Sequence, residues 1–503
     1  MATTTGRGLK QDSAYRPAGR RRDGGCAVLR RRRRDPLRSR ATGPGPYTAC
    51  RTAYGKAATG TTSPGSGGSP MHGRRGGTAR VAIPHRRGGS AEPAEIERAA
   101  RGVCRPVLLF ARSVAAADPG LVREAEALFP VRVFGRQALA EAVRGVGADG
   151  ITTFHDGEVD GVTAVASALG LPGPTAAPSP WDKLTQRTLL AGAGLTRVTA
   201  VAVDSAEAFA SALDTVRLPA VLKPRRGVGG SGIAFVDDRS DADYQLRHRT
   251  RWSDLLLETR LPPYEHPRGG WRADYVSVET ASTGDDHIPV AVFDKAPVAV
   301  CRRAGPGASD TVSVTGDLTP TRLPLPVRDR VLAYVRNVLR TLRVRWCVSH
   351  TEVKLLSDGV DLIEVNGRVG GHLPRLLMAL EGPDLLAAAM RLALALDPDV
   401  PPLAGGAPRG YAMGLFPTFA EKSGTVRSDV ARERLERLPC VVRVDEVAEH
   451  GAPRRATGYR AANVVLRARD ESEMDTAVAT VAAEISALFA ADGLAEAGWL
   501  DNF

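Results

Sequence analysis

Dividing 503 residues by about 150 residues per domain predicts roughly three domains, and the 43% share of apolar residues excludes a wholly disordered chain. The formal net charge of +12 is unevenly placed, because residues 1–105 carry 23 Lys and Arg against 6 Asp and Glu, whereas residues 106–503 carry 45 against 50. The excess of basic over acidic residues therefore indicates a nucleic-acid partner only for the N-terminal segment and not for the rest of the chain.

Residues 1–105 are rich in Gly, Arg, Ser, Thr and Pro and have almost no aliphatic periodicity. Such a composition cannot bury enough apolar surface to offset the entropy of ordering, so we expect a disordered basic tail. The tail could be an arm that binds nucleic acid or anionic lipid. It could also be a non-functional extension from a start codon assigned too far upstream, and we favour this second hypothesis because charge runs are commonly just solvated.

Cysteine usage and hydropathy indicate the compartment. The six cysteines are far apart, with no Cys-x-x-Cys pair and no histidine spacing that would hold zinc. No run of about eighteen apolar residues occurs, and the arginine-rich N-terminus lacks the apolar core of a secretory signal. We therefore expect a cytoplasmic protein with no membrane partner.

From Pro106 to Pro180, strand and helix signals alternate. Short apolar runs predict strands and amphipathic stretches predict helices, which gives a βαβαβα pattern. Such a pattern implies a small parallel sheet covered by helices, which we assign to residues 106–180. The signals, in chain order, lie at residues 107–111, 121–128, 131–134, 151–154 and 159–169.

Residues 181–404 contain the motifs described below, and a Pro- and Gly-rich stretch at 398–408 leads from them into residues 405–503. This last segment has a strand pattern at 463–468 and a long helical pattern from about 471 to 490, which together predict a C-terminal α+β segment. The predicted fold class is therefore α/β in the N-terminal domain and α+β beyond it.

A glycine-rich loop, Gly227-Val-Gly-Gly-Ser-Gly232, follows a strand pattern at 220–223 and leads into another at 233–236. Strand, glycine loop and strand form a hairpin flap, in which free backbone N–H groups can wrap phosphates. Lys223, directly before the flap, would add a positive charge. The alternative is a plain glycine turn with a solvated lysine. A second stretch of the same spacing, at 145–150, precedes a strand and so does not fit a dinucleotide-binding loop.

A stronger signal is a hairpin pattern in which residues 349–354 and 361–368 flank the turn Ser357-Asp-Gly359. Centring the hairpin on this turn places Glu352 opposite Glu364. Two carboxylates about 5 Å apart on one face are destabilising unless a cation lies between them. The pattern therefore indicates a cation site, and the alternative is an exposed acidic hairpin.

The same register places His350 opposite Asn366 on the polar face. Two carboxylates and the amide oxygen of Asn366 are hard ligands, which suit a Mg²⁺ ion that bridges nucleotide phosphates. His350 and Lys354 share this face, and packing beside the metal site is the expected role of the histidine. The side chains expected to face the core are Val353, Leu355, Ile363 and Val365.

Five short motifs follow one another along the chain: Asp182-Lys183, Val221-Leu-Lys-Pro224, Leu255-Leu-Leu-Glu258, His350-Thr-Glu-Val-Lys354 and Ile363-Glu-Val-Asn-Gly-Arg-Val-Gly-Gly371. In order and spacing they resemble the ATP-grasp superfamily. Within it, the sequence is similar to the carboxylate-amine ligases related to bacterial L-amino-acid (dipeptide) ligases and to the carbamoyl-phosphate synthetase type domain. The resemblance covers roughly residues 106–400 and implies an ATP-grasp fold preceded by the small parallel domain.

The resemblance also implies roles for residues at the matching positions. Contacts with the phosphates of ATP would come from Lys183, Lys223 and the flap residues Gly227, Gly229, Gly230, Ser231 and Gly232. The adenine pocket would be lined by Glu258 and by the backbone through Leu261. Mg²⁺ or Mn²⁺ would be held by Glu352, Glu364 and Asn366, and the reacting carboxylate or acyl phosphate would meet the catalytic Arg368.

Further substrate contacts are expected at Asp294-Lys295, Arg322 and the loop Gly370-Gly371-His372. The residue that contacts the ribose stays open, because Asp274 stands where the related enzymes commonly have a glutamate.

The implied activity is an ATP- and Mg²⁺-dependent ligase that forms an amide or peptide bond through an acyl phosphate and releases ADP and phosphate. Small carboxylates and amines, above all amino acids, are the expected substrates, and a homo-oligomer is left open. The alternatives are another ATP-grasp activity, such as a carboxylase or phosphotransferase, and a non-catalytic nucleotide-binding regulator. The full set of lysines, glutamates, Asn366 and Arg368 favours chemistry over binding alone.

Overall fold

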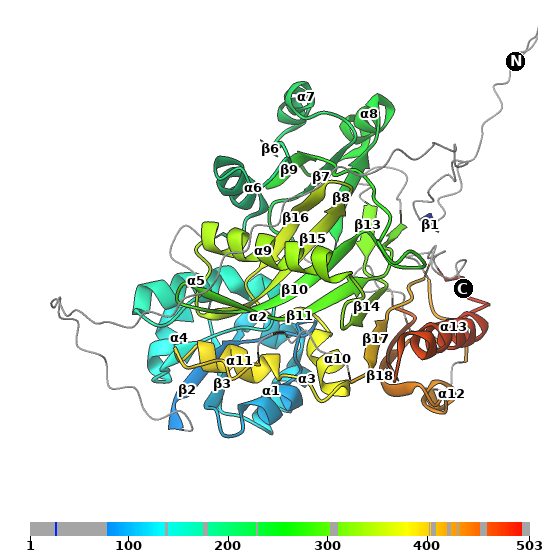
Figure 1. The fold of residues 1–503 in the computed structure, drawn as a ribbon. Helices are drawn as coiled ribbons and strands as arrows, with labels where there is room; N and C mark the ends of the chain where they lie inside the picture. Colours follow the sequence, from blue (N-terminus) through cyan, green and yellow to red (C-terminus); the bar gives the residue numbers. More distant parts are fainter. Residues whose placement is uncertain are drawn as a thin grey trace, which may run out of the picture.

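The computed structural model describes residues 26–27, 78–135, 139–174, 180–227, 230–301, 310–401, 403, 409–419, 424–429, 432–452 and 460–494. Within these ranges the strands form three sheets, of four, eight and seven strands. Figure 1 shows the four-stranded domain, coloured blue to cyan, below the large sheet, with helices α7 and α8 at the opposite end of the molecule. No helix in this part of the chain has the length and apolar character needed to cross a membrane.

The N-terminal sheet has the strand order β4-β3-β2-β5, and every neighbouring pair is parallel. Helices connect the strands and cover the sheet, so the predicted small parallel α/β domain is confirmed. The strands are β2 (Arg80–Pro84), β3 (Arg105–Ala111), β4 (Val131–Phe134) and β5 (Gly150–Ile151). The helices are α1 (Pro93–Ala100), α2 (Arg112–Ala117), α3 (Pro119–Glu126), α4 (Leu139–Gly145) and α5 (Asp156–Leu169).

This domain begins earlier than the sequence predicted. Strand β2 and helix α1 lie within residues 1–105, which were assigned to a disordered tail. β2 is an inner strand between β3 and β5, and Val81, Ala82 and Ile83 are fully buried in it. Only these three consecutive apolar residues mark the strand, and arginines and glycines surround them, so the composition of the segment hides it. The predicted boundary at residue 105 is therefore wrong, and the rest of the predicted tail, residues 1–77 apart from 26–27, lies outside the described residues.

The seven-stranded sheet has the order β1-β12-β13-β8-β7-β9-β6, with antiparallel pairing throughout. The glycine loop joins β7 to β8, as the hairpin prediction required. Its strands are β1 (Cys26–Ala27), β6 (Ala200–Val203), β7 (Ala220–Pro224), β8 (Ser231–Val236), β9 (Leu255–Thr259), β12 (Ala299–Cys301) and β13 (Asp310–Ser313). Helices α6 (Lys183–Gly192), α7 (Ala206–Thr215) and α8 (Arg239–His248) accompany this sheet, and Phe209 of α7 is fully buried in the core between them.

The eight-stranded sheet is antiparallel and has the order β16-β15-β10-β11-β14-β17-β19-β18. Residues after 405 complete this sheet through β17 and β19, so they do not form a sheet of their own. The strands are β10 (Tyr275–Thr283), β11 (Asp286–Lys295), β14 (Gly316–Thr319), β15 (Cys347–Leu356), β16 (Gly359–Asn366), β17 (Tyr411–Leu415), β18 (Val441–Val447) and β19 (Ala462–Ala468). The accompanying helices are α9 (Leu325–Thr341), α10 (Leu373–Ala379), α11 (Leu385–Leu392), α12 (Arg432–Glu436) and α13 (Glu471–Leu488).

One buried apolar cluster joins the N-terminal domain to the large sheet. It contains Ile96 of α1, Met390 of α11 and Phe293 of β11, all fully buried. An ion pair of 2.6 Å between Arg98 Nη1 and Asp384 Oδ2 lies across the same boundary. Because this packing fixes the N-terminal domain on the sheet, residues of both can contribute to a single site.

Candidate active site

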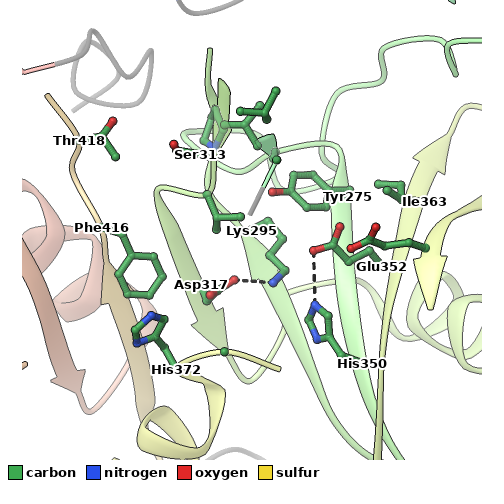
Figure 2. A pocket seen from close by; sticks show the side chains of 18 of the residues that line it. Tyr275, Lys295, Ser313, Asp317, His350, Glu352, Ile363, His372, Phe416 and Thr418 are labelled. Atoms are coloured by element: carbon green, nitrogen blue, oxygen red, sulfur yellow. Dashed lines mark hydrogen bonds and ion pairs between the residues drawn. The ribbon is translucent and has the colours of Figure 1, made fainter. Parts of the chain in front are cut away.

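A cavity of about 2500 Å³ lies between the glycine loop, the large sheet and the N-terminal domain. Pockets for one small ligand commonly measure about 300–1000 Å³, so this cavity has room for a nucleotide and further substrates. Figure 2 shows side chains of β10, β11, β14 and β15 and of the loop before α10 pointing into it. The predicted site residues that line it are Lys183, Lys223, Gly227, Gly230, Glu258, Leu261, Glu352, Glu364, Asn366 and Arg368.

The glycine loop lies against β13. Gly230 has a φ of +66°, and a Cβ there would lie 2.0 Å from a backbone carbonyl oxygen of β13, so only glycine fits this position. Gly227 and Gly230 line the cavity, whereas Gly232, with a φ of +79°, is not among the lining residues. Gly229 and the side chain of Ser231 lie outside the described residues. The structure therefore describes the predicted flap up to Gly227 and again from Gly230 onward.

The hairpin of β15 and β16 has the predicted register at its polar end. Glu352 lies opposite Glu364, and His350 lies opposite Asn366. All four side chains line the cavity, so the predicted juxtaposition of two carboxylates and an amide is confirmed.

A β-bulge after Glu352 shifts the rest of this register by one residue, so that Val353 pairs with Leu362. As a result Leu362 is fully buried, while Ile363 is half-buried and lines the cavity, as Figure 2 shows. The prediction that Ile363 faces the core is therefore wrong, because strict alternation does not allow for a bulge.

Glu364 is held by two neighbours. Lys183 Nζ lies 3.0 Å from Glu364 Oε2, and Asn366 Nδ2 donates to Glu364 Oε1 at 2.9 Å. Burial alone would raise the pKa of Glu364, but Lys183 and Asn366 outweigh it and lower the pKa to about 2. Glu364 is therefore a carboxylate at neutral pH, with the ammonium of Lys183 beside it.

A second buried charge cluster centres on Glu258. Its carboxylate accepts hydrogen bonds from Arg187 at 2.9 and 3.2 Å and lies 2.6 Å from Lys223 Nζ. Burial would raise the pKa of Glu258, but the two cations lower it to about 2. Burial also lowers the pKa of Lys223, against the opposing effect of Glu258. Sequence reasoning missed Arg187, although its spacing of four from Lys183 places both on one face of α6.

His350 lies between two carboxylates. Its Nδ1 is 2.5 Å from Glu279 Oε1 and its Nε2 is 3.4 Å from Glu352 Oε1. Burial would lower the pKa of His350, but the charge of Glu279 and the two hydrogen bonds raise it to about 9. Glu279, which sequence reasoning did not identify, also accepts from the backbone N–H of Gly370 at 3.0 Å. The histidine is therefore a cation that holds Glu352 in place.

Arg368 reaches across to the N-terminal domain. Its Nε and Nη2 donate to the carboxylate of Asp156 at 2.7 and 2.5 Å, and its Nη1 donates to the carbonyl oxygen of Val369. The guanidinium lines the cavity, so its predicted contact with the reacting group stays a prediction. Asp156 begins helix α5 and has no sequence motif that marks it.

The expected substrate contacts lie in different places. Lys295 lines the cavity and forms a buried ion pair with Asp317 at 2.6 Å (Figure 2). Asp294 is on the opposite face of β11 and accepts from the backbone of Arg322 at 2.8 Å. Arg322 is buried against α13, with its Nη1 3.1 Å from Glu471. The predictions for Asp294 and Arg322 are therefore wrong, because neither lines the cavity.

The adenine side of the predicted site contains Asp274. Its Oδ1 lies 2.5 Å from Lys354 Nζ, and its other carboxylate oxygen accepts from the backbone N–H of Tyr264 at 2.9 Å. Asp274, Lys354 and Leu261 all line the cavity. A carboxylate thus lies close to the segment predicted to hold adenine.

The metal prediction depends on Glu352, Glu364 and Asn366. Among the described residues, no three His, Cys, Asp or Glu side chains gather as a complete metal site. Two opposed carboxylates and an amide oxygen make a partial set of hard ligands, and Mg²⁺ in nucleotide sites commonly takes its other ligands from phosphates and water. The three residues therefore fit a metal ion that arrives with a nucleotide.

Comparison with known proteins gives matches in sequence and in structure, although no family model matches. Alanine–anticapsin ligase of Bacillus subtilis (strain 168) is 26% identical over 246 residues, which cover 45% of this chain and 49% of that protein. Carnosine synthase 1 of Gallus gallus is 30% identical over 226 residues, which cover 44% of this chain and 23% of that protein. The chain thus spans about half or less of the length of these curated relatives.

Among solved structures, the L-amino acid ligase from Bacillus licheniformis superimposes with a TM-score of 0.62 at 19% sequence identity. The superposition covers 82% of this chain and 98% of that ligase. The likeness thus extends over most of this chain, which agrees with the motif order in the sequence. The chain therefore has the ATP-grasp fold.

Proposed function

We propose that this protein is an ATP- and Mg²⁺-dependent ligase that joins the carboxylate of one small molecule to the amine of another, with release of ADP and phosphate. The observation that carries the proposal is the set of charges on one wall of the cavity. Lys183, Lys223 and Arg187 supply three cations there, and Glu352 and Glu364 supply two opposed carboxylates. Phosphoryl transfer is catalysed chiefly by positioning and charge neutralisation, which such a wall provides.

The reaction has two steps. An oxygen of the substrate carboxylate attacks the γ-phosphorus of ATP, the bond to the β,γ-bridging oxygen breaks, and ADP leaves. The amine then attacks the carbonyl carbon of the acyl phosphate, phosphate leaves with the former carboxylate oxygen, and the amine loses a proton. Water must be excluded between the two steps, because it would hydrolyse the acyl phosphate.

The buried ion pairs fix the cations before ATP arrives. Glu258 holds the amine of Lys223 and the guanidinium of Arg187, so neither side chain needs to be ordered during the reaction. The pKa of Lys223 is lowered by burial, and the negative phosphates of a nucleotide would favour its charged form.

Glu352, Glu364 and Asn366 would hold the metal ion that accompanies ATP. When bound, Mg²⁺ neutralises charge on the phosphates. The short contact with Glu279 fixes the ring of His350, and the other nitrogen of that ring orients Glu352. Lys183 keeps Glu364 ionised. Arg368, fixed by Asp156, would meet the reacting carboxylate or the acyl phosphate.

Amino acids are the proposed substrates. The names of the matched relatives support this class, since they describe a ligase of alanine with anticapsin, a carnosine synthase and an L-amino acid ligase. The large cavity also supports it, because ATP alone would not fill it.

A screen of amino-acid pairs with ATP and Mg²⁺ tests the proposal, with ADP and phosphate release as the first readout and mass spectrometry of the products as the second. We expect ADP release that requires both an acid and an amine and equals the amount of amide. Stable transfer of phosphate to a hydroxyl group would indicate a phosphotransferase, and bicarbonate-dependent product would indicate a carboxylase. Nucleotide binding without any turnover would indicate a regulator.

A further inference from the structure

One wall of the cavity carries an arginine that no carboxylate neutralises at close range. Arg460 lies just before β19, and its guanidinium carbon is 4.4 Å from the ring centroid of Phe416. Its Nη1 contacts Nε2 of His372. Among the described residues, no carboxylate forms an ion pair with Arg460, although the side chain is only partly exposed and lines the cavity. A partly buried cation of this kind favours an anion as its ligand.

The neighbouring arginines differ in this respect. Arg375 pairs with Glu95 at 2.8 Å and with Asp445 at 3.2 Å, and Arg443 pairs with the same two carboxylates. The two carboxylates are therefore shared by two arginines, and neither forms an ion pair with Arg460. Burial lowers the pKa of Arg460 against the opposing charges of Asp317, Glu446 and Asp445, and a guanidinium stays charged in proteins.

The hydrogen bonding around His372 leads to the same conclusion. Burial and the nearby arginines hold the pKa of His372 well below its usual value, so the imidazole is neutral and carries one N–H. Donors approach both of its nitrogens, with Arg460 at Nε2 and with Arg375 and Asn463 at Nδ1. A neutral imidazole can accept at only one nitrogen, so this group has more donors than acceptors. A bound anion would supply the missing acceptors.

Two unpaired polar atoms lie on the same wall. Asn463 is 2% exposed, and its Oδ1 has no hydrogen-bond partner within the described residues. Rotating that amide would let Oδ1 accept from His372 and would turn the NH₂ group to the position at which Oδ1 has no partner. Thr418 is 4% exposed, its hydroxyl has no partner in the same part of the chain, and it lines the cavity, with Phe416 between it and His372 in Figure 2. Buried polar atoms without partners are costly, so they point to a polar ligand.

We propose that Arg460, His372 and Asn463 bind the spectator carboxylate of the amine substrate. The inference rests on the proposed ligase function, because that reaction consumes the carboxylate of the acid substrate and leaves a carboxylate on the amine substrate unreacted. The reacting carboxylate must lie at the phosphates, on the wall of Lys183 and Glu364. Figure 2 shows His372 and Phe416 on the other side of Lys295 and Asp317 from His350 and Glu352. The amine substrate is therefore an amino acid with a free carboxylate.

Steady-state kinetics with two forms of the amine substrate test this inference. The amino acid that turns over in the wild-type protein is compared with its carboxamide, which is neutral at the same position. We expect Arg460→Met to lower kcat/KM for the amino acid by about 30-fold or more, the equivalent of losing a buried charge pair. The value for the carboxamide and the KM for ATP should change less than about threefold. Arg467→Met, at an exposed position on the adjoining strand β19, is the matched control and should leave all three values unchanged.

Asn463→Asp is the second variant, in case Arg460→Met does not fold. It places a carboxylate beside His372, which Arg460 also contacts, and should lower kcat/KM for the amino acid and leave the carboxamide nearly unaffected. Equal losses for the amino acid and the carboxamide in both variants, or a wild-type protein that does not discriminate between the two substrates, would overturn the subsite while leaving the ligase intact. A wild-type protein that turns over no acid and amine pair would overturn the ligase proposal and the subsite with it.

Discussion

Replacing Glu258 by glutamine removes the charge at the centre of the buried cluster and changes little else in shape. In the wild-type protein this carboxylate is the counter-charge that Arg187 and Lys223 share, and both lie within hydrogen-bonding distance of it. Glutamine has the size of a neutral glutamic acid, so the variant leaves two buried cations without a counter-charge. We expect Glu258→Gln to fold and to be markedly less stable at neutral pH.

The size of the loss follows from the pKa of Glu258, which is lowered from 4.5 to about 2. Each unit of difference between the folded-state and unfolded-state pKa corresponds to about 1.36 kcal/mol, so the ionised carboxylate stabilises the fold by about 3 kcal/mol at pH 7. A lowered pKa gives stability that is present above the unfolded-state pKa and is lost as the pH falls through the folded-state pKa. At pH 3 the same relation gives a contribution of about 1.4 kcal/mol from Glu258 to the free energy of unfolding.

Urea unfolding at pH 7 and pH 3 measures this prediction. The difference in unfolding free energy between wild type and Glu258→Gln should be about 3 kcal/mol at pH 7 and less than half of that at pH 3. Glu433→Gln, at an exposed position on α12, is the control and should match the wild type at both pH values. A difference that is below about 1 kcal/mol at pH 7, or that does not shrink with falling pH, would refute the role of the cluster.

Other predictions concern the termini, the loop and the metal ligands. A chain that lacks residues 1–77 should keep its turnover, whereas a chain that lacks residues 1–105 should not fold, because it loses inner strand β2; circular dichroism and product assays distinguish these outcomes. Gly230→Ala should weaken ATP binding and cost about 1–2 kcal/mol, since φ is +66° and the added Cβ meets the backbone of β13; nucleotide titration and thermal unfolding measure it. Glu364→Gln should raise the Mg²⁺ concentration for half-maximal turnover by about tenfold or more and leave the fold intact, and an unchanged Mg²⁺ dependence would contradict its role as a ligand.

The polar face of the β15–β16 hairpin could be predicted because a short turn fixes the pairing of its strands. Glu352, Glu364, His350 and Asn366 are close in sequence, and two strands joined by such a turn have few possible registers. The bulge after Glu352 was not foreseen, because no residue marks it, and so Ile363 was assigned to the wrong face.

Other residues of the site are set by tertiary contacts between distant segments. Arg187 belongs to the site because it pairs with Glu258, and Asp156 because it pairs with Arg368. Both partners lie far along the chain, so a single sequence does not reveal either pair. Strand β2 has three apolar residues in a basic segment, and its inner place in the sheet depends on neighbours that follow it. Arg460 likewise resembles a surface arginine until its partly buried surroundings are known.

The central claim is the acyl phosphate, and the path of one oxygen atom tests it most directly. Turnover of an acid substrate labelled with ¹⁸O in its carboxylate, followed by mass spectrometry of the released phosphate, shows whether the bond between carboxylate oxygen and phosphorus forms. The account predicts that each phosphate released with ADP carries one ¹⁸O atom. Unlabelled phosphate, or AMP and pyrophosphate in place of ADP and phosphate, would contradict it.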